Sequence, residues 1–228
     1  MKIFEYARQK ILTVLDKIQK NRRKKYFKKT KDRLQNRDFS LVSNYCSGCV
    51  LLHELGMRFN SQFVNLAIHS EDYIEYLENF DKYNEMPLRF IEPDAKKGYP
   101  IGKLGDLTIY FVHYKTNEQA REKWEQRKQR INKDNLFIIY MCQDEDGCNE
   151  EIMERFDRLP FPNKVMFTNK EYPQFKSAFF CKEFVNEPGV PMFYDFKNHF
   201  TVKRKYDVFD FVSWFNGETD LKKLDLQK

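Results

Sequence analysis

The chain has 228 residues, of which 41% are hydrophobic and 16% aromatic, enough to bury the core of one large domain. Lys and Arg number 40 against 34 Asp and Glu, so the formal net charge is +6. With only 8 Gly and 8 Pro, the composition excludes wholesale disorder, collagen-like repeats and low-complexity sequence.

Nothing in the sequence predicts a membrane span or a secretion signal. The longest apolar run, 136–142, is far shorter than the roughly 20 residues that cross a bilayer. Glu5, Arg8 and Asp16 interrupt any apolar core of a signal peptide. We therefore expect a cytoplasmic protein. Its five cysteines are expected to be mostly free thiols, because an odd number cannot all pair within one chain.

The positive charge is concentrated at the N-terminus. Residues 1–31 contain 12 basic and 2 acidic side chains, a net charge of +10, whereas the rest of the chain carries −4. Apolar residues in this segment recur at three- and four-residue spacings, which predicts one stripe of a helix. The stripe consists of Ile3, Ala7, Ile11, Val14, Leu15 and Ile18.

An apolar stripe beside the cations of 22–29 suits the anionic inner face of a cell membrane. We therefore predict a basic amphipathic helical arm over 1–36 that binds such a surface through residues 1–31. A solvated helix that docks on the domain or on a partner remains the alternative. Nucleic acid is disfavoured as a partner, because no nucleic-acid-binding module follows the basic run.

The body of the chain, 37–228, alternates expected strands and helices. Strands are expected at 39–44, 63–68, 107–113, 136–142, 164–168 and 177–181, with a brief apolar segment at 88–91. Helices are expected at 49–55, 71–80, 117–131, 150–159 and 206–215. Ser70 and Asn117 are the expected N-caps, and Gly56 and Gly217 the expected stops. This alternation predicts a single three-layer α/β/α domain with a mainly parallel sheet.

Ligands of such sheets bind at the carboxyl ends of the strands, where Cys46 occupies a strand-to-helix turn. The N-terminus of the following helix lowers the pKa of a nearby thiol, and Gly48 permits close approach of the backbone. His113 ends another expected inner strand, so we expect a thiolate–imidazolium pair with Cys46. Ser43 and Asn44 compete for the same role, as hydroxyl nucleophile and oxyanion donor. A packed, inert thiol and a structural histidine are the alternative.

Cys46 and Cys49 together match half of a zinc site or a dithiol redox motif. A structural zinc ion needs two further ligands, and Cys142 and Cys148 lack the usual spacing. No thioredoxin-like arrangement surrounds the pair. Both interpretations therefore rank below a single nucleophilic cysteine.

Two further groups of charged residues are candidates for binding a substrate. Asp144 and Asp146 follow the buried run 136–142 and could hold Mg²⁺ or Mn²⁺ against a diphosphate, although the match is weak and a solvated acidic turn is the more common explanation. Arg127 and Arg130 share one helix face and could bind a phosphate, or could simply complement the helix dipole. No other cofactor is indicated.

Several segments carry a resemblance to a known family: 39–48, 99–106, 111–115, 120–124, 127–132, 134–135, 146–148 and 163–168. Together they resemble an uncharacterised bacterial family whose members are often labelled exopolysaccharide or capsule biosynthesis proteins. That family is more distantly similar to a bacterial group described as papain-like. Tyr45, Ser47 and Cys49 depart from the Asn, Trp and Gly that are more usual in the turn.

The resemblance implies a cytoplasmic, peripherally membrane-associated enzyme of surface-polysaccharide assembly. We expect a transferase that modifies a lipid-linked or nucleotide-activated sugar, with Cys46 or Ser43 as nucleophile and His113 as base. The expected substrate-binding residues are Asn44, Gly48, Asp106, Lys115, Arg127, Arg130 and Asn132. Two alternatives remain open: a metal-dependent glycosyltransferase that uses Asp144 and Asp146, and a non-catalytic scaffold that docks on a membrane complex through residues 1–31.

Overall fold

Two β-sheets organise the chain in the computed structural model, which describes residues 2–92, 98–198 and 200–227. The larger sheet is parallel and has the order β1-β5-β6-β7: β1 (Ser40–Ser43), β5 (Leu136–Met141), β6 (Asn163–Thr168) and β7 (Ala178–Phe180). The smaller is antiparallel and has the order β2-β3-β4: β2 (Arg89–Ile91), β3 (Ile101–Leu104) and β4 (Leu107–Tyr110). The predicted α/β class with a mainly parallel sheet is confirmed.

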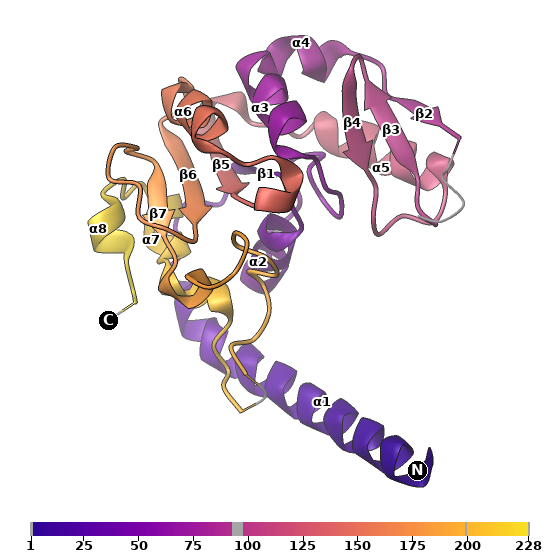
Figure 1. Cartoon of the computed structure of the whole chain (residues 1–228), viewed down its shortest axis with the longest axis vertical. Helices are drawn as coiled ribbons and strands as arrows, with labels where there is room; N and C mark the ends of the chain where they lie inside the picture. Colours follow the sequence, from indigo (N-terminus) through magenta and orange to yellow (C-terminus); the bar gives the residue numbers. More distant parts are fainter. Residues whose placement is uncertain (1, 93–97, 199, 228) are drawn as a thin grey trace.

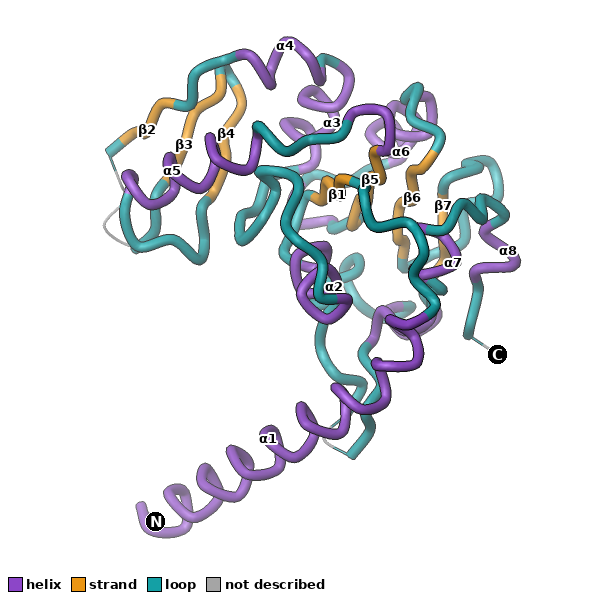
Figure 2. The backbone as a smooth tube through the Cα atoms, turned by 180° about the vertical axis from the view of Figure 1, so that it is seen from behind, coloured by secondary structure: helices purple, strands orange, loops and turns teal. Residues whose placement is uncertain are grey.

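The helices of the described residues are α1 (Lys2–Asp32), α2 (Ser47–Leu55), α3 (Ser70–Glu78), α4 (Phe80–Glu85), α5 (Asn117–Lys128), α6 (Glu150–Arg158), α7 (Phe211–Phe215) and α8 (Leu221–Leu224). Short 3₁₀ turns occur at Lys133–Asn135, Asp144–Asp146, Lys182–Phe184 and Lys205–Val208. The β2–β4 sheet, with α5 against it, lies at the side of the molecule away from β7 (Figures 1 and 2).

Successive residues of β5 alternate between two hydrophobic cores, one on each face of the parallel sheet. Ile138 and Tyr140 belong to the core that α3 and α6 cover, whereas Phe137, Ile139 and Met141 belong to the core that α2 and α7 cover. Because both faces are covered, every residue of β5 is buried, as its continuous apolar sequence predicts. The three-layer arrangement is therefore confirmed.

Helix α1 has two parts with different surroundings, and the predicted N-terminal helix is confirmed. Its first part projects from the body (Figure 1), and Val14 and Ile18 there are 57% and 49% exposed. Arg23 and Phe27 in its second part are buried against the body. The side chains of Ile3, Ala7 and Ile11 lie outside the described residues. In the part of the chain that the structure describes, no helix is long and apolar enough to cross a membrane.

Two expected strands differ from the structure. The segment 63–68 is not a strand, because Asn65 has a φ of 60°, a left-handed conformation that interrupts an extended ladder. Its one ladder contact is a bridge from Ala67 to Tyr110. The expected strand 107–113 ends at Tyr110 and belongs to the antiparallel sheet rather than the parallel one. A left-handed turn at Gly105 folds it back on β3, which the sequence interpretation missed.

The helix boundaries also needed correction. His69 and Thr116 are the N-caps of α3 and α5, one residue before the expected Ser70 and Asn117. The expected helix 206–215 is a 3₁₀ turn followed by the short α7. Asp210 separates the two, because its side chain accepts a hydrogen bond from the Ser213 backbone and starts α7 afresh.

Candidate functional site

The turn between β1 and α2 is held in place by buried polar groups. Asn44 is fully buried, and its amide donates to the Met141 carbonyl at 3.0 Å and accepts from the Met141 N–H at 2.9 Å. This pair of bonds continues the β1–β5 ladder for one more residue. Ser43 is buried, and a Cβ at Gly48 would lie only 3.0 Å from its Cβ, so α2 can begin this close to β1 only with glycine there. Asn44, Ser43 and Gly48 thus shape the turn.

That turn presents two thiols at the first turn of α2. Cys46 is the N-cap residue and Cys49 follows one helical turn later. The Cys49 sulfur lies 2.9 Å from the Cys46 carbonyl oxygen and 3.3 Å from Asn65 Oδ1, so its single S–H donates to one of these acceptors at a time, and the two thiols also influence each other's acidity. Cys46 also donates to the carbonyl of Leu66 at 3.8 Å.

The pKa values of the two thiols are shifted in opposite directions. The hydrogen bond from Cys46 lowers the pKa of Cys49 to about 7, with help from the backbone of Asn65 and the charge of Arg127 and against the effect of burial. The same hydrogen bond, together with burial, raises the pKa of Cys46. Of the two thiols, Cys49 is therefore the one whose ionisation the pair favours.

Arg127 lies near the Cys49 thiol, and the charges of Arg127 and Arg58 both act on a third arginine, Arg130. Arg127 donates to the Tyr114 hydroxyl at 2.6 Å and lies over the ring of Phe59 at 5.5 Å. Arg130 donates to the Phe59 carbonyl at 3.3 Å, and the charges of Arg58 and Arg127 contribute, after burial, to lowering its pKa. Among the described residues, no carboxylate forms an ion pair with any of these three arginines. They therefore form a cluster of cations whose charge the surrounding protein leaves uncompensated.

Tyr114 orients the arginine nearest to the thiols. Its hydroxyl donates to the Val64 carbonyl at 2.8 Å while it accepts from Arg127, so the guanidinium is held in one direction. Burial raises the pKa of Tyr114, which keeps the hydroxyl protonated. Tyr114, Asn65 and Arg58 were not among the predicted site residues, although Tyr114 lies within the 111–115 segment that carries the family resemblance.

The structure brings the predicted Arg127 to the Cys49 thiol and Arg130 to Arg127, but it gives His113 different surroundings. His113 is exposed, and no hydrogen bond or ion pair joins it to another described residue. Its neighbour Tyr114 is the side chain that reaches Arg127. A Cys46–His113 pair therefore stays a prediction.

Three other predicted site residues have contacts elsewhere in the described structure and none with the thiol turn. Lys115 is exposed and lines a separate cavity of about 370 Å³ with Tyr99 and Thr116. Asp106 is exposed in the β3–β4 turn, at the opposite end of β4 from His113. Asn132 has a supporting contact: its amide donates to the Asp38 carbonyl at 3.0 Å and so ties the entry of β5 to that of β1.

The two aspartates after β5 have unequal surroundings. Asp144 is exposed, whereas Asp146 lies 3.4 Å from the imidazole of His69, and burial raises its pKa. Within the described ranges, no group of three or more His, Cys, Asp or Glu side chains is placed to hold a metal ion. A site in which Asp144 and Asp146 hold Mg²⁺ or Mn²⁺ against a diphosphate stays a prediction.

Comparisons with known proteins cover the whole of this site. A family model described as "Domain of unknown function (DUF1919)" matches residues 17–216. An uncharacterized protein of Haemophilus influenzae is 43% identical over 198 residues, which is 86% of this chain and 94% of that protein. The match begins within α1, just before its anchored part, and ends just after α7. The chain therefore belongs to the DUF1919 family of domains of unknown function.

Proposed function

We propose that the protein is a transferase of surface-polysaccharide assembly that acts on a nucleotide-activated or lipid-linked sugar. One observation carries the proposal: Arg127, one of three neighbouring arginines without carboxylate partners in the described chain, acts on the Cys49 thiol, whose pKa is lowered. Both classes of donor carry a diphosphate, and guanidinium groups bind phosphate oxygens in a bidentate manner. The assignment to polysaccharide assembly rests on the family resemblance of the sequence.

In this proposal the Cys49 thiolate attacks the sugar carbon that bears the diphosphate. A carbon–sulfur bond forms, the carbon–oxygen bond breaks, and its electron pair leaves with the diphosphate, whose charge Arg127 and Arg130 neutralise. An acceptor hydroxyl then displaces the sulfur and gives up its proton, which restores the thiol. Two displacements at one carbon predict retention of the anomeric configuration.

Substitutions at this site are expected to abolish polymer formation. In a strain that lacks the gene, we expect complementation with Cys49→Ala or Arg127→Met to yield at least about tenfold less surface polysaccharide than the wild-type gene, because a nucleophile or a phosphate ligand is lost. Lys123→Met, which removes a partly exposed α5 cation that pairs with Glu122, is expected to restore wild-type levels. Cys46→Ala, Ser43→Ala and His113→Ala in the same assay test the nucleophiles and the base that the sequence predicts, in place of Cys49.

Wild-type amounts of polymer from both Cys49→Ala and Arg127→Met would exclude the catalytic proposal. If the same strains lose polymer only when the first part of α1 is altered, the non-catalytic scaffold is the better description. Loss of polymer on alanine substitution of Asp144 and Asp146, with Mn²⁺-dependent binding of a nucleotide sugar, would instead favour the metal-dependent glycosyltransferase.

We also propose that the first part of α1 binds an anionic membrane surface. Val14 and Ile18 are about half exposed, one turn apart on the projecting helix, and basic residues follow them. Val14→Glu with Ile18→Glu is expected to reduce co-sedimentation with phosphatidylglycerol vesicles about fivefold or more, because both apolar burial and charge attraction are lost.

The control for this experiment carries the same change in charge away from the apolar stripe. Thr13→Glu with Gln35→Glu alters two exposed positions, one on another face of α1 and one beyond its C-terminal end, and is expected to reduce binding by less than about twofold. Equal losses from the two double variants would show that net charge alone determines vesicle binding, contrary to an inserted apolar stripe.

A further inference from the structure

A second cationic cavity lies at the other end of α2 from the thiols. It has a volume of about 620 Å³ and lies between the second part of α1 and the C-terminal half of α2. Lys20, Lys24, Lys28 and Lys31 line it from α1, and His53 and Gly56 from α2, with Arg204 close by. Its size is typical of a site for a small ligand.

The lysines of this cavity share one face of α1. Their spacings of four, four and three residues place them along a single stripe of the helix. The adjacent stripe, which includes Gln19, Arg23 and Phe27, is the one that packs against the body. Because the stripe with Arg23 packs against the body, the neighbouring stripe of lysines faces α2.

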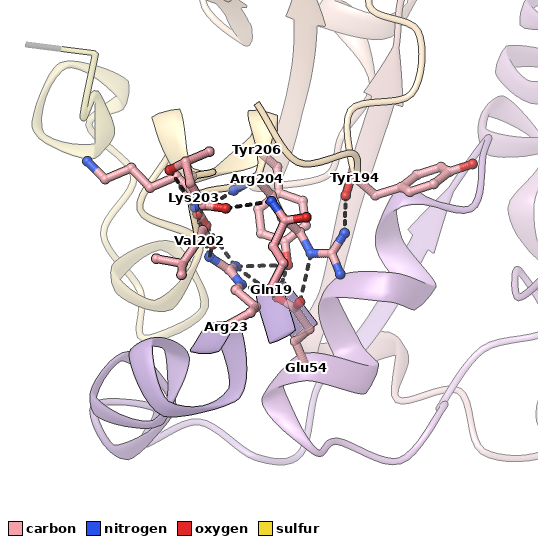
Figure 3. A network of polar contacts seen from close by, with 10 residues as sticks. Gln19, Arg23, Glu54, Tyr194, Val202, Lys203, Arg204 and Tyr206 are labelled. Atoms are coloured by element: carbon pink, nitrogen blue, oxygen red, sulfur yellow. Dashed lines mark hydrogen bonds and ion pairs between the residues drawn. The ribbon is translucent and has the colours of Figure 1, made fainter. Parts of the chain in front are cut away.

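Most of the charge around the cavity floor is already compensated (Figure 3). Arg23 donates to Glu54 and Asp207, and Arg204 donates to the other oxygen of Glu54 at 2.7 Å. Glu54 is the one acidic residue among the described residues that line the cavity, and these two arginines and the Tyr206 hydroxyl use its oxygens. It has no further capacity to neutralise the lysines.

The lysines differ in how far they are compensated. Lys20 pairs with Asp16 at 2.8 Å, and Lys31 lies against Gly56 at the C-terminus of α2, where the helix dipole attracts a cation. Lys24 and Lys28 have no carboxylate partner in the described part of the chain. The apolar side chains of the lining are Phe27 of α1, which is 7% exposed, and Val50 of α2.

We propose that this cavity binds a phosphate- or diphosphate-bearing ligand, with Lys24 and Lys28 on the phosphate and its apolar portion on Phe27 and Val50. Lysine ammonium groups bind phosphate as point charges, and their interaction is strong inside a partly enclosed site. The ligand is either a soluble phosphate ester or the headgroup of a lipid. This site is independent of the thiols and of the transferase proposal.

The experiment measures binding of two probes to the full-length protein. Calorimetry with geranyl diphosphate tests a soluble ligand, and co-sedimentation with phosphatidylcholine vesicles that contain phosphatidic acid tests a headgroup. Lys24→Gln with Lys28→Gln is expected to weaken binding of at least one probe about tenfold or more, since two charge-assisted hydrogen bonds are lost. Lys25→Gln with Lys29→Gln, the matched change on the same helix outside the cavity, is expected to change it less than about twofold.

If the Lys24→Gln, Lys28→Gln variant loses binding of geranyl diphosphate, the ligand is a soluble phosphate ester. If it loses binding of the phosphatidic acid vesicles, the ligand is a lipid headgroup. Cys49→Ala is expected to bind both probes as the wild type does, so failure of the transferase proposal leaves this result unaffected. Equal losses from the two lysine double variants, or no binding of either probe by the wild type, would overturn the proposal. Far-ultraviolet circular dichroism checks that both double variants keep the helix content of the wild type.

Discussion

Replacing Arg23 by methionine is expected to lower the free energy of unfolding by about 3 kcal/mol or more. Arg23 is 2% exposed, and its guanidinium donates to Glu54 and Asp207, whose side chains are 12% and 11% exposed. Removing one partner of a buried ion pair leaves the other charges without compensation, and such changes cost roughly 3–5 kcal/mol. Urea denaturation of the two proteins measures the difference.

The matched control is Arg33→Met. Arg33 also forms an ion pair, with Asp210 at 2.6 Å, but its side chain is 52% exposed. Surface pairs of this kind contribute about 0–1 kcal/mol, so this variant is expected to lose less than about 1 kcal/mol. Losses of equal size from Arg23→Met and Arg33→Met would contradict the assignment of Arg23 as the anchor of α1.

The Arg23 effect is also expected to depend on pH. Burial would raise the pKa of Glu54, but hydrogen bonds from Arg23 and Tyr206 and the charge of Arg204 lower it below its ordinary value. A lowered carboxyl pKa contributes stability above the pKa of the unfolded chain, and that stability is lost as the pH falls toward the folded value. The difference between wild type and Arg23→Met is therefore expected to narrow below about pH 4.3.

Arg23 also illustrates what the sequence could not show. It lies in the run of basic residues 22–29, which predicts a surface that binds anions. Its burial depends on Glu54 and Asp207, which lie 31 and 184 residues away along the chain. No local pattern distinguishes such an arginine from its exposed neighbours Arg22 and Lys24.

The parallel sheet was predictable chiefly from β5, which is buried on both faces and appears as an apolar run between two helices. The antiparallel sheet was not, because β4 has the same local pattern as a parallel strand and its partner β3 contains Gly102. That glycine is a packing requirement: a Cβ there would lie 2.8 Å from both Leu88 and Phe111. The fold therefore requires glycine at a position of β3 where glycine weakens the sequence pattern that would predict a strand.

The thiol–arginine site was predictable in part. Cys46 was recognised from its place after a strand, and Arg127 and Arg130 from their spacing. Asn65 could not be recognised, because its role depends on a left-handed backbone in a segment that the apolar pattern predicts as a strand. Tyr114 rather than His113 faces Arg127, because the end of β4 at Tyr110 breaks the alternation that had been extended to residue 113.

The acidity of Cys49 gives the second large expected effect. Because interaction with Cys46 lowers its pKa to about 7, the buried Cys49 thiol is expected to ionise closer to neutral pH than an ordinary cysteine, and the thiolate is the reactive form. Alkylation by iodoacetamide, followed for each cysteine by peptide mass spectrometry, is expected to show a midpoint near pH 7 for Cys49. Burial raises the pKa of Cys181, so that thiol is expected to stay unmodified in the folded protein.

Cys46→Ala removes the largest cause of this acidity, the hydrogen bond between the two thiols. The alkylation midpoint of Cys49 is then expected to rise by about one pH unit or more. The alkylation rate at pH 7 is expected to fall about tenfold, because a rise of one unit in the pKa lowers the thiolate fraction about tenfold. Arg127→Met is expected to shift the midpoint in the same direction by less. Cys148, which owes its own lowered pKa first to Cys142, is the internal control and is expected to react unchanged. Two results would contradict this account: a Cys49 midpoint near pH 9 in the wild type, or a midpoint that Cys46→Ala does not change. Either would show that the Cys46 thiol does not lower the pKa of Cys49. The proposed transfer would then lack a thiolate nucleophile at neutral pH.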